Sequence, residues 1–236
     1  MTRKWEFYYN KSMDNFYIKT KYGDFYSQFE KYCSLLVEWN EKINLTAITE
    51  KDEVFTKHFV DSLIGEEFIK KNATVIDIGT GAGFPSLPIK IVREDINLTL
   101  NDCLNKRLIF LNEIINKLGL KNVSTLHSRA EDLNKNVKYD YALSRAVASL
   151  NTLSEYCLPF VKEGGYFIAY KSKDIDEELK NSEKAIEILG GKIEEVKEIE
   201  IPNTDIVRKL VFIKKIKQTP NKYPRGKNLP KTKPLN

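Results

Sequence analysis

The sequence contains little cysteine and no long apolar run, and both absences exclude classes of protein. Its three cysteines, Cys33, Cys103 and Cys157, lie far apart and form no Cys-x-x-Cys pair. A disulfide framework and a structural zinc site are therefore not expected. No stretch approaches the roughly 18 uninterrupted apolar residues of a membrane-spanning helix, and no apolar stretch of a secretory signal follows the basic first residues. We expect a cytoplasmic protein with buried thiols, without a metal and without membrane association.

The composition is that of a globular chain with an uneven distribution of charge. Apolar residues make up 42% and charged residues 30% of the 236 residues, which suffices for one large α/β domain with a buried core. The net charge is +5, yet residues 206–236 contain ten Lys and Arg and no Asp or Glu. The rest of the chain is therefore mildly acidic, and the basic C-terminal end favours a polyanionic partner.

The N-terminal part of the chain has the apolar spacing of helices. Between residues 25 and 43, apolar side chains recur at steps of three and four, as on one face of an amphipathic helix. A second helix is expected over 52–69, whereas residues 1–22 show no period that assigns them. We interpret residues 1–70 as an N-terminal helical extension.

From residue 73 onward, short apolar runs alternate with helical stretches. Strands are expected over 74–78, 98–101, 123–127, 139–144 and 166–170, and helices over 87–93, 105–118, 150–161 and 176–189. Such alternation predicts a parallel sheet with helices on both faces. The runs 192–201 and 206–216 are connected too closely for anything but an antiparallel hairpin. Residues 71–217 should thus form a Rossmann-like domain with a mostly parallel, seven-stranded sheet.

The last segment, 218–236, is basic and contains four prolines. Proline removes a backbone donor and fixes φ, so prolines at this density argue against regular secondary structure. An extended tail is expected here.

A glycine-rich loop follows the first expected strand, where residues 77–85 read DIGTGAGFP. Glycine lets the backbone approach a ligand and adopt a positive φ at a strand-to-helix turn. A dinucleotide site would need its third glycine at the position of Phe84, and a P-loop would need Gly-Lys-Ser/Thr. The spacing Asp-x-Gly-x-Gly-x-Gly, which includes Gly79 and Gly81, is instead the pattern of an S-adenosylmethionine site.

Further candidate side chains follow the next strands, at the edge of the sheet where the glycine loop lies. Asp102 ends the second strand, 23 residues after the first glycine of the loop, and a carboxylate there can accept both ribose hydroxyls of an adenosine. Ala130 and Glu131 follow the third strand, where an adenine would lie. Arg145 follows the fourth strand and can hold a carboxylate or phosphate through two hydrogen bonds. Lys171, after the fifth strand, is expected to face the same crevice.

Taken together, six stretches resemble the RsmG (GidB) family of bacterial small-subunit ribosomal RNA methyltransferases, which modify a guanine at N7. They are EWNEKINLTAI at 38–48, HFVDS at 58–62, the loop at 77–85, SRAE at 128–131, SRA at 144–146 and KYPR at 222–225. The resemblance extends over residues 26–235. Two departures from the family pattern are Ser86, where the family has glycine, and a tail in which Gly226 and Asn228 replace the usual glycine position. Asparagine tolerates the left-handed conformation that a glycine would supply there.

The resemblance implies a fold, a cofactor and a substrate. The fold is that of class I S-adenosylmethionine-dependent methyltransferases, and the reaction is methylation of guanine N7 in 16S ribosomal RNA or the small subunit by what we expect to be a monomer. The implied cofactor residues are Gly79, Gly81, Phe84, Asp102, Ala130, Glu131 and Arg145. The candidate RNA contacts are Lys222, Arg225, Lys231 and Lys233.

The chemistry of guanine N7 agrees with what the sequence lacks. This nitrogen carries a lone pair and no proton, so methyl transfer to it needs no general base. The chain has neither the Asn/Asp-Pro-Pro-Tyr/Phe motif of amino-group methylation nor the Pro-Cys pair of cytosine C5 methylation.

Several alternatives stay open at this stage. A class I methyltransferase of small molecules or proteins would share the fold but would not need the basic tail. An RNA-binding protein with an inert nucleotide fold should have lost the glycines or Asp102, which are present. His58 is either a functional residue or an ordinary histidine between helices. Residues 44–46 could simply connect two helices, with Thr49 as the N-cap of the second.

Overall fold

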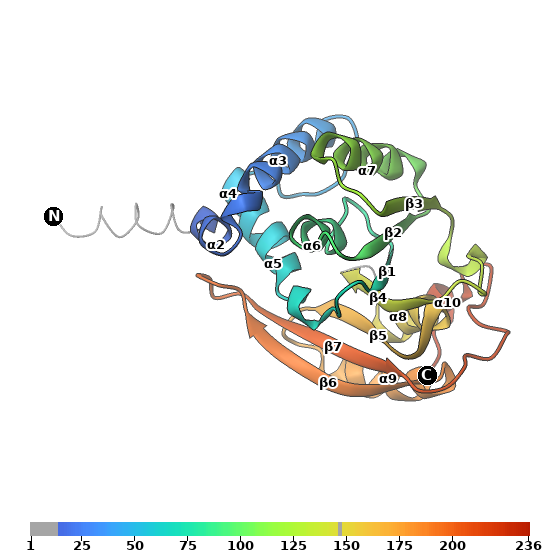
Figure 1. Ribbon diagram of the computed structural model, residues 1–236. Coiled ribbons are helices and arrows are strands. Elements are labelled where there is room, and N and C mark those ends of the chain that lie inside the picture. Colours follow the sequence, from blue (N-terminus) through green and yellow to red (C-terminus); the bar gives the residue numbers. More distant parts are fainter. Residues whose placement is uncertain (1–13, 146–147) are drawn as a thin grey trace.

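The computed structural model describes residues 14–145 and 148–236, and a seven-stranded sheet forms its centre (Figure 1). The strands are β1 (Thr74–Ile78), β2 (Asn97–Asp102), β3 (Val123–His127), β4 (Tyr139–Arg145), β5 (Val161–Lys171), β6 (Gly191–Glu200) and β7 (Val207–Lys215). Their spatial order is β3-β2-β1-β4-β5-β7-β6. Because the order reverses between β1 and β4, the carboxyl ends of these two strands mark the topological switch point where ligands bind in such sheets.

Strands β1 to β5 pair in parallel, whereas β7 is antiparallel to both β5 and β6. The connection between β6 and β7 covers only residues 201–206, which is too short for the crossover that parallel neighbours require. The mostly parallel sheet with a C-terminal hairpin, expected from the sequence, is confirmed.

Helices cover both faces of the sheet, and neighbouring residues of one strand belong to different hydrophobic clusters. Val75 and Leu143 pack in the cluster that contains α3, α6 and α7, whereas Ile76 and Ala142 pack with α8 and α9. This division follows from the alternation of side chains along a strand. The helices are α2 (Asp14–Lys21), α3 (Tyr26–Asn40), α4 (Lys51–Val54), α5 (Asp61–Leu63), α6 (Ser86–Val92), α7 (Asn105–Leu118), α8 (Leu150–Cys157), α9 (Asp176–Ile188) and α10 (Leu229–Thr232). None of these helices has the length and apolar content that a bilayer crossing would require.

The N-terminal helices share a core with the sheet. Phe29, Tyr32 and Leu36 of α3 are buried in the same cluster as Leu100 of β2 and Leu111 of α7. Figure 1 shows α3 running beside α7 on this side of the molecule. Helix α3 therefore packs directly over the part of the sheet from which the glycine loop leaves.

The second N-terminal helix is shorter than the sequence pattern predicts. The helical stretch begins at Lys51, passes through a π-helical segment (Phe55–Val60) and ends with α5 at Leu63. A Cβ placed on Gly65 would lie 2.1 Å from the hydroxyl oxygen of Tyr170 on β5. A side chain would not fit at this position, so glycine lets the backbone pack this closely against β5, and a short 3-10 turn (Glu66–Phe68) follows.

The connection between α3 and α4 also differs from one expectation. Thr49 is not the N-cap of the next helix, because Glu50 occupies that position and its side chain makes no capping bond. Helix α3 ends at Asn40, whose side-chain oxygen accepts hydrogen bonds from the backbone N–H groups of Leu45 and Thr46 at 2.8 and 3.0 Å. This amide fixes the loop that carries residues 44–46.

The prolines suggested an extended tail, but the structure shows that the tail is folded against the domain. It packs along α8 and contains the helical turn α10, in which Pro230 occupies the first turn, where no backbone donor is needed. Thr152 of α8 donates to the carbonyl of Pro230 at 2.9 Å, and Asn151 donates to the carbonyl of Leu235 at 2.9 Å. Burial of Tyr223 and Pro230 means that the tail is part of the folded domain.

Candidate active site

The glycine loop leaves β1 in a conformation that its sequence makes possible. Gly81 has a φ of +60°, and a Cβ added there would meet no atom within 4 Å, so its backbone borders open space. Gly83 has a φ of +97°, and a Cβ there would lie 2.5 Å from the hydroxyl oxygen of Tyr32. That hydroxyl donates to the carbonyl of Ala82. Helix α3 thus packs against one side of the glycine loop, at Ala82 and Gly83, while the side of the loop at Gly81 stays accessible.

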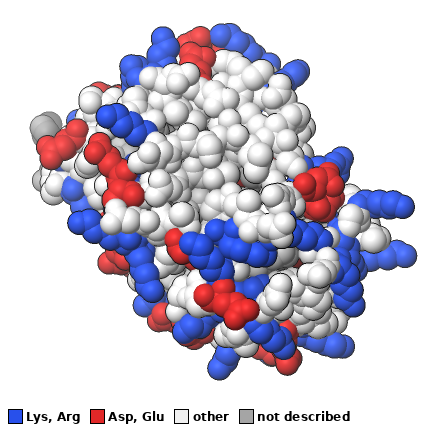
Figure 2. All heavy atoms as spheres, turned by 45° about the vertical axis from the view of Figure 1, so that its right-hand side comes forward, with Lys and Arg blue, Asp and Glu red and all other residues white. Residues whose placement is uncertain are grey.

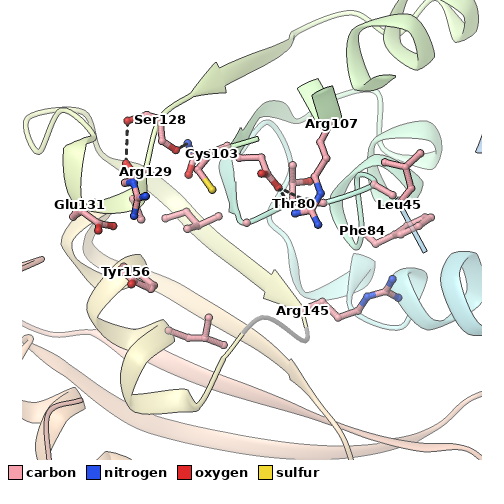
Figure 3. A pocket seen from close by; sticks show the side chains of 18 of the residues that line it. Leu45, Thr80, Phe84, Cys103, Arg107, Ser128, Arg129, Glu131, Arg145 and Tyr156 are labelled. Carbon is pink, nitrogen blue, oxygen red and sulfur yellow. Dashed lines mark hydrogen bonds and ion pairs between the residues drawn. The ribbon is translucent and has the colours of Figure 1, made fainter. Parts of the chain in front are cut away.

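A cavity of about 500 Å³ lies in front of this loop, at the carboxyl ends of the parallel strands. Its volume falls within the range of small-molecule sites. Leu45, Phe84 and Arg145 lie at one end of it, and Glu131 and Tyr156 at the other (Figure 3). The structure brings all seven predicted cofactor residues to its wall. They are Gly79, Gly81, Phe84, Asp102, Ala130, Glu131 and Arg145.

Asp102 is the last residue of β2 and lines the cavity. Its Oδ2 accepts hydrogen bonds from the backbone N–H of Gly81 at 3.0 Å and from Arg107 at 3.2 Å. Its Oδ1 accepts from the backbone N–H of Leu104 at 2.9 Å. A carboxylate offers about four acceptor sites, so Asp102 can fix the loop and still accept a hydrogen bond from a ligand.

The Glu131 end of the cavity is closed by a part of the chain that sequence reasoning did not place there. The backbone N–H of Asn228 donates to Glu131 Oε1 at 3.3 Å, and Asn228 lines the cavity. Asn228 has a φ of +58°, which confirms that asparagine takes a left-handed conformation in the tail. The contact joins the basic tail to the glycine-loop cavity.

At the opposite end, Arg145 is held by several groups. Its guanidinium donates to Asp61 Oδ2 at 3.0 Å and to His58 Nδ1 at 3.1 Å, and it lies 4.9 Å from the ring centroid of Phe84. The ring of His58 stacks on Phe84 with centroids 4.4 Å apart. Burial and the positive charge of Arg145 lower the pKa of His58 to about 3. This histidine is therefore neutral at physiological pH and contacts the site.

Sequence reasoning missed Asp61 and Arg208 at this end. Asp61 is 3% exposed and binds Arg145 through one oxygen and Arg208 through the other, at 2.9 Å. Asp61 lies within the HFVDS stretch, so the stretch itself was the available signal. The pairing with Arg208 on β7 had none, because 147 residues separate the two.

Lys171 does not face the glycine-loop cavity, contrary to the expectation. Its ammonium group donates to Glu178 Oε1 at 2.6 Å and to the carbonyl of Ala148 at 2.8 Å. It lines a separate cavity of about 670 Å³, whose wall includes His58 and Arg145 from the other side. Lys171 is the last residue of β5, which is one strand farther from the switch point than β4. Ala146, part of the SRA stretch, lies outside the described residues.

The four candidate RNA-binding residues of the tail do not share one environment. Lys222, Lys231 and Lys233 are exposed, whereas Arg225 binds Glu155 through two nitrogens, at 2.9 and 2.7 Å. Figure 2 shows the molecule turned so that the side of the tail comes forward. Lys and Arg form a belt across the lower part of this face, whereas the upper centre of the same face is largely uncharged. Three of the candidates are thus accessible to a polyanion, and Arg225 mainly holds the tail on α8.

Metal ligands do not gather in the part of the chain that the structure describes. No group of three or more His, Cys, Asp or Glu side chains there could hold a metal ion.

Comparison with solved structures supports the fold assignment. TrmN from Thermus thermophilus superimposes with a TM-score of 0.51 at 16% identity, covering 69% of this chain and 53% of that one. M. jannaschii TYW2, solved in complex with AdoMet, gives a TM-score of 0.53 at 16% identity and covers 66% of this chain and 77% of its own. These similarities identify the fold of class I methyltransferases.

Sequence comparison gives the family. The model of the GidB family, described as rRNA small subunit methyltransferase G, matches residues 25–207. The ribosomal RNA small subunit methyltransferase G of Desulforamulus reducens is 56% identical over 213 residues, 88% of this chain and 89% of the relative. That of Clostridium perfringens is 55% identical over 221 residues, 90% of this chain and 91% of the relative. The chain belongs to the GidB family of small-subunit ribosomal RNA methyltransferases.

Proposed function

We propose that this enzyme transfers a methyl group from S-adenosylmethionine to N7 of a guanine in 16S ribosomal RNA. The observation that carries the proposal is the single cavity that the glycine loop, Asp102 and Arg145 line together at the topological switch point. Membership of the GidB family supplies the substrate class.

The residues of the cavity fit S-adenosylmethionine. The open space beside Gly81 admits a ligand against the backbone, and Asp102 keeps acceptor capacity for ribose hydroxyls. Ala130 and Glu131 would border the adenine, and Arg145 and Phe84 the methionine end. When bound, this cofactor supplies an electrophilic methyl group on a positively charged sulfur.

The protein's own contribution is alignment and electrostatics. Because guanine N7 bears no proton, no side chain has to remove one, and the rate depends on holding the nitrogen in line with the methyl group. His58 is neutral and does not add a second positive charge beside Arg145. The aromatic ring of Phe84 packs against Arg145 and His58 at this end.

The proposal is tested by mapping methylation of 16S ribosomal RNA with and without the protein. Cells that lack the chain should lose one guanine N7 methyl group, and the purified protein with S-adenosylmethionine should restore it. An unchanged modification pattern would contradict the proposal.

Asp102→Ala should weaken S-adenosylmethionine binding by about 2–3 kcal/mol, because hydrogen bonds to a charged group are lost. Titration calorimetry measures this directly. Asp132→Ala is the matched control, since Asp132 is an exposed carboxylate at the same edge that does not line the cavity. If Asp102→Ala bound the cofactor as tightly as the parent, Asp102 would not belong to the site.

We further propose that the exposed lysines of the tail contact RNA phosphates. Replacing Lys222, Lys227, Lys231 and Lys233 by alanine should flatten the plot of log affinity against log salt by about 3 units, as expected for four lost phosphate contacts. Arg225 is kept, because it holds the tail in place.

The matched control replaces four exposed lysines that lie before the amino ends of β1 and β3 or in the last turn of α7, away from the carboxyl ends of the strands. They are Lys70, Lys71, Lys117 and Lys121. This variant should keep the slope of the parent. Equal slopes in the two variants would mean that the tail lysines are merely solvated.

A further inference from the structure

Thr46 belongs to a stretch that the proposed function leaves without a role. It lies in the loop between α3 and α4 and lines the glycine-loop cavity together with Leu45, His58 and Arg145. Two hydrogen bonds from the backbone to Asn40 hold this loop. The position of Thr46 is therefore determined by the fold before any ligand binds.

The hydrogen bonds around His58 determine what the Thr46 hydroxyl can do. An arginine can only donate, so we assign His58 Nδ1 as the acceptor of the bond from Arg145 at 3.1 Å. In the neutral ring the proton then resides on Nε2, which donates to Thr46 Oγ1 at 2.8 Å. The backbone N–H of Ile48 also donates to this oxygen, at 3.0 Å.

Both acceptor positions of the Thr46 hydroxyl are thus filled. A hydroxyl has two lone pairs and one proton, so Thr46 can make a third hydrogen bond only as a donor. Among residues 14–145 and 148–236, no side chain or carbonyl accepts that proton. With both acceptor positions used, the hydroxyl of Thr46 keeps its proton for a group that enters the cavity that Thr46 lines.

We propose that the Thr46 hydroxyl donates to O6 of the target guanine and so selects guanine at the methylation site. The inference rests on the proposed function, since that function requires a guanine beside the methionine end of the cavity. O6 is an acceptor next to N7, whereas adenine carries an amino donor at the same place. A fixed donor can form a hydrogen bond with guanine O6, but it faces another donor when adenine is bound. The site is selective because binding adenine would leave these polar groups unpaired. His58 acts as a positioning residue for the hydroxyl.

The test compares Thr46→Val, which keeps the shape and loses the hydroxyl, with Thr46→Ser, which keeps the hydroxyl. The substrate is small subunits from cells that lack the chain, methylated in a single turnover at saturating S-adenosylmethionine. Thr46→Val should be at least about tenfold slower, the value of one hydrogen bond in the transition state, with unchanged cofactor affinity by calorimetry. Thr46→Ser should recover most of the rate.

Two further variants separate a role in recognition from a role in folding. Thr99→Val removes a hydroxyl of β2 whose one hydrogen-bond partner among the described residues is Ser124, and it should methylate like the parent. His58→Phe keeps a ring beside Phe84 but cannot orient the hydroxyl, so it should slow transfer, and the double variant with Thr46→Val should be no slower than Thr46→Val alone.

Three results would overturn the inference. Thr46→Val could methylate at the parent rate, which would mean that the hydroxyl is idle. It could bind the cofactor more weakly yet react at the parent rate when saturated, which would make the cofactor the acceptor. Thr46→Ser could be as slow as Thr46→Val, which would make the effect one of packing. Failure of the parent protein to methylate guanine would instead refute the proposed function.

Discussion

Arg225→Ala is expected to lower the free energy of unfolding by about 3–5 kcal/mol, the cost of removing one partner from a buried ion pair. The carboxylate of Glu155 is fully buried in α8, and the Arg225 guanidinium donates to both of its oxygens. Without this side chain, the one partner left to the carboxylate within the described part of the chain is the backbone N–H of residue 225, which donates to Oε1 at 2.7 Å. The melting temperature of the variant should then be lower than that of the parent by at least about 6 °C.

The control for this prediction is a variant that also removes the charge of Glu155. In the double variant with Glu155→Gln, no buried charge is left without a partner, so much of the lost stability should return. Lys222→Ala removes an exposed charge from the same segment and should change stability little. A melting temperature of Arg225→Ala equal to that of the parent would show that the pair contributes nothing to tail docking.

The same ion pair explains why the tail could not be predicted from its sequence. Basic residues and prolines suggested a solvated, extended segment, and this interpretation was correct for the exposure of Lys222 and Lys231. The one available signal was Glu155, a charged residue within the apolar pattern of an expected helix. Its partner lies 70 residues away, and no local rule connects the two.

Elements were predicted well where local sequence determines their ends. The helix over 105–118 has the bounds expected, because Gly119 takes a left-handed conformation with a φ of +65° directly after it. The strands over 74–78 and 123–127 also agree residue for residue. The helix expected over 52–69 ends earlier, at Leu63. The next residues pack against β5, where Gly65 lies close to Tyr170, and helical periodicity does not reveal such a tertiary contact.

The candidate site shows the same division. Glycines after a strand and a carboxylate after the next strand are readable, since the fold brings the carboxyl ends of parallel strands together. Asp61 and Thr46 were not singled out, because their roles depend on Arg145, which lies 84 residues from Asp61. Sequence reasoning thus finds the half of the site that the sheet builds. For the half that the N-terminal helices add, it gives the stretches at 38–48 and 58–62 and an open role for His58, but not the contacts of Asp61 and Thr46.

Arg145→Met is expected to slow methyl transfer by about 10²–10³-fold, the usual loss for one preorganised donor at a reacting centre. Arg145 ends β4 at the end of the cavity where we propose that the methionine moiety lies, and its donors to Asp61 and His58 fix the guanidinium over Phe84. Single-turnover methylation of small subunits measures the rate, and thermal melting run alongside measures the effect of leaving Asp61 with one partner fewer.

Arg145→Lys separates geometry from charge in this last prediction. Lysine keeps a positive charge near Asp61 but lacks the planar fork that contacts Asp61 and His58 at once. It should therefore melt close to the parent and still lose at least about tenfold in rate, equivalent to roughly 1.4 kcal/mol of transition-state stabilisation. If Arg145→Lys both folded and methylated like the parent, the positive charge alone would be needed. If Arg145→Met did so as well, Arg145 would have no part in the reaction, and its contacts would serve only to join β4 to the N-terminal helices.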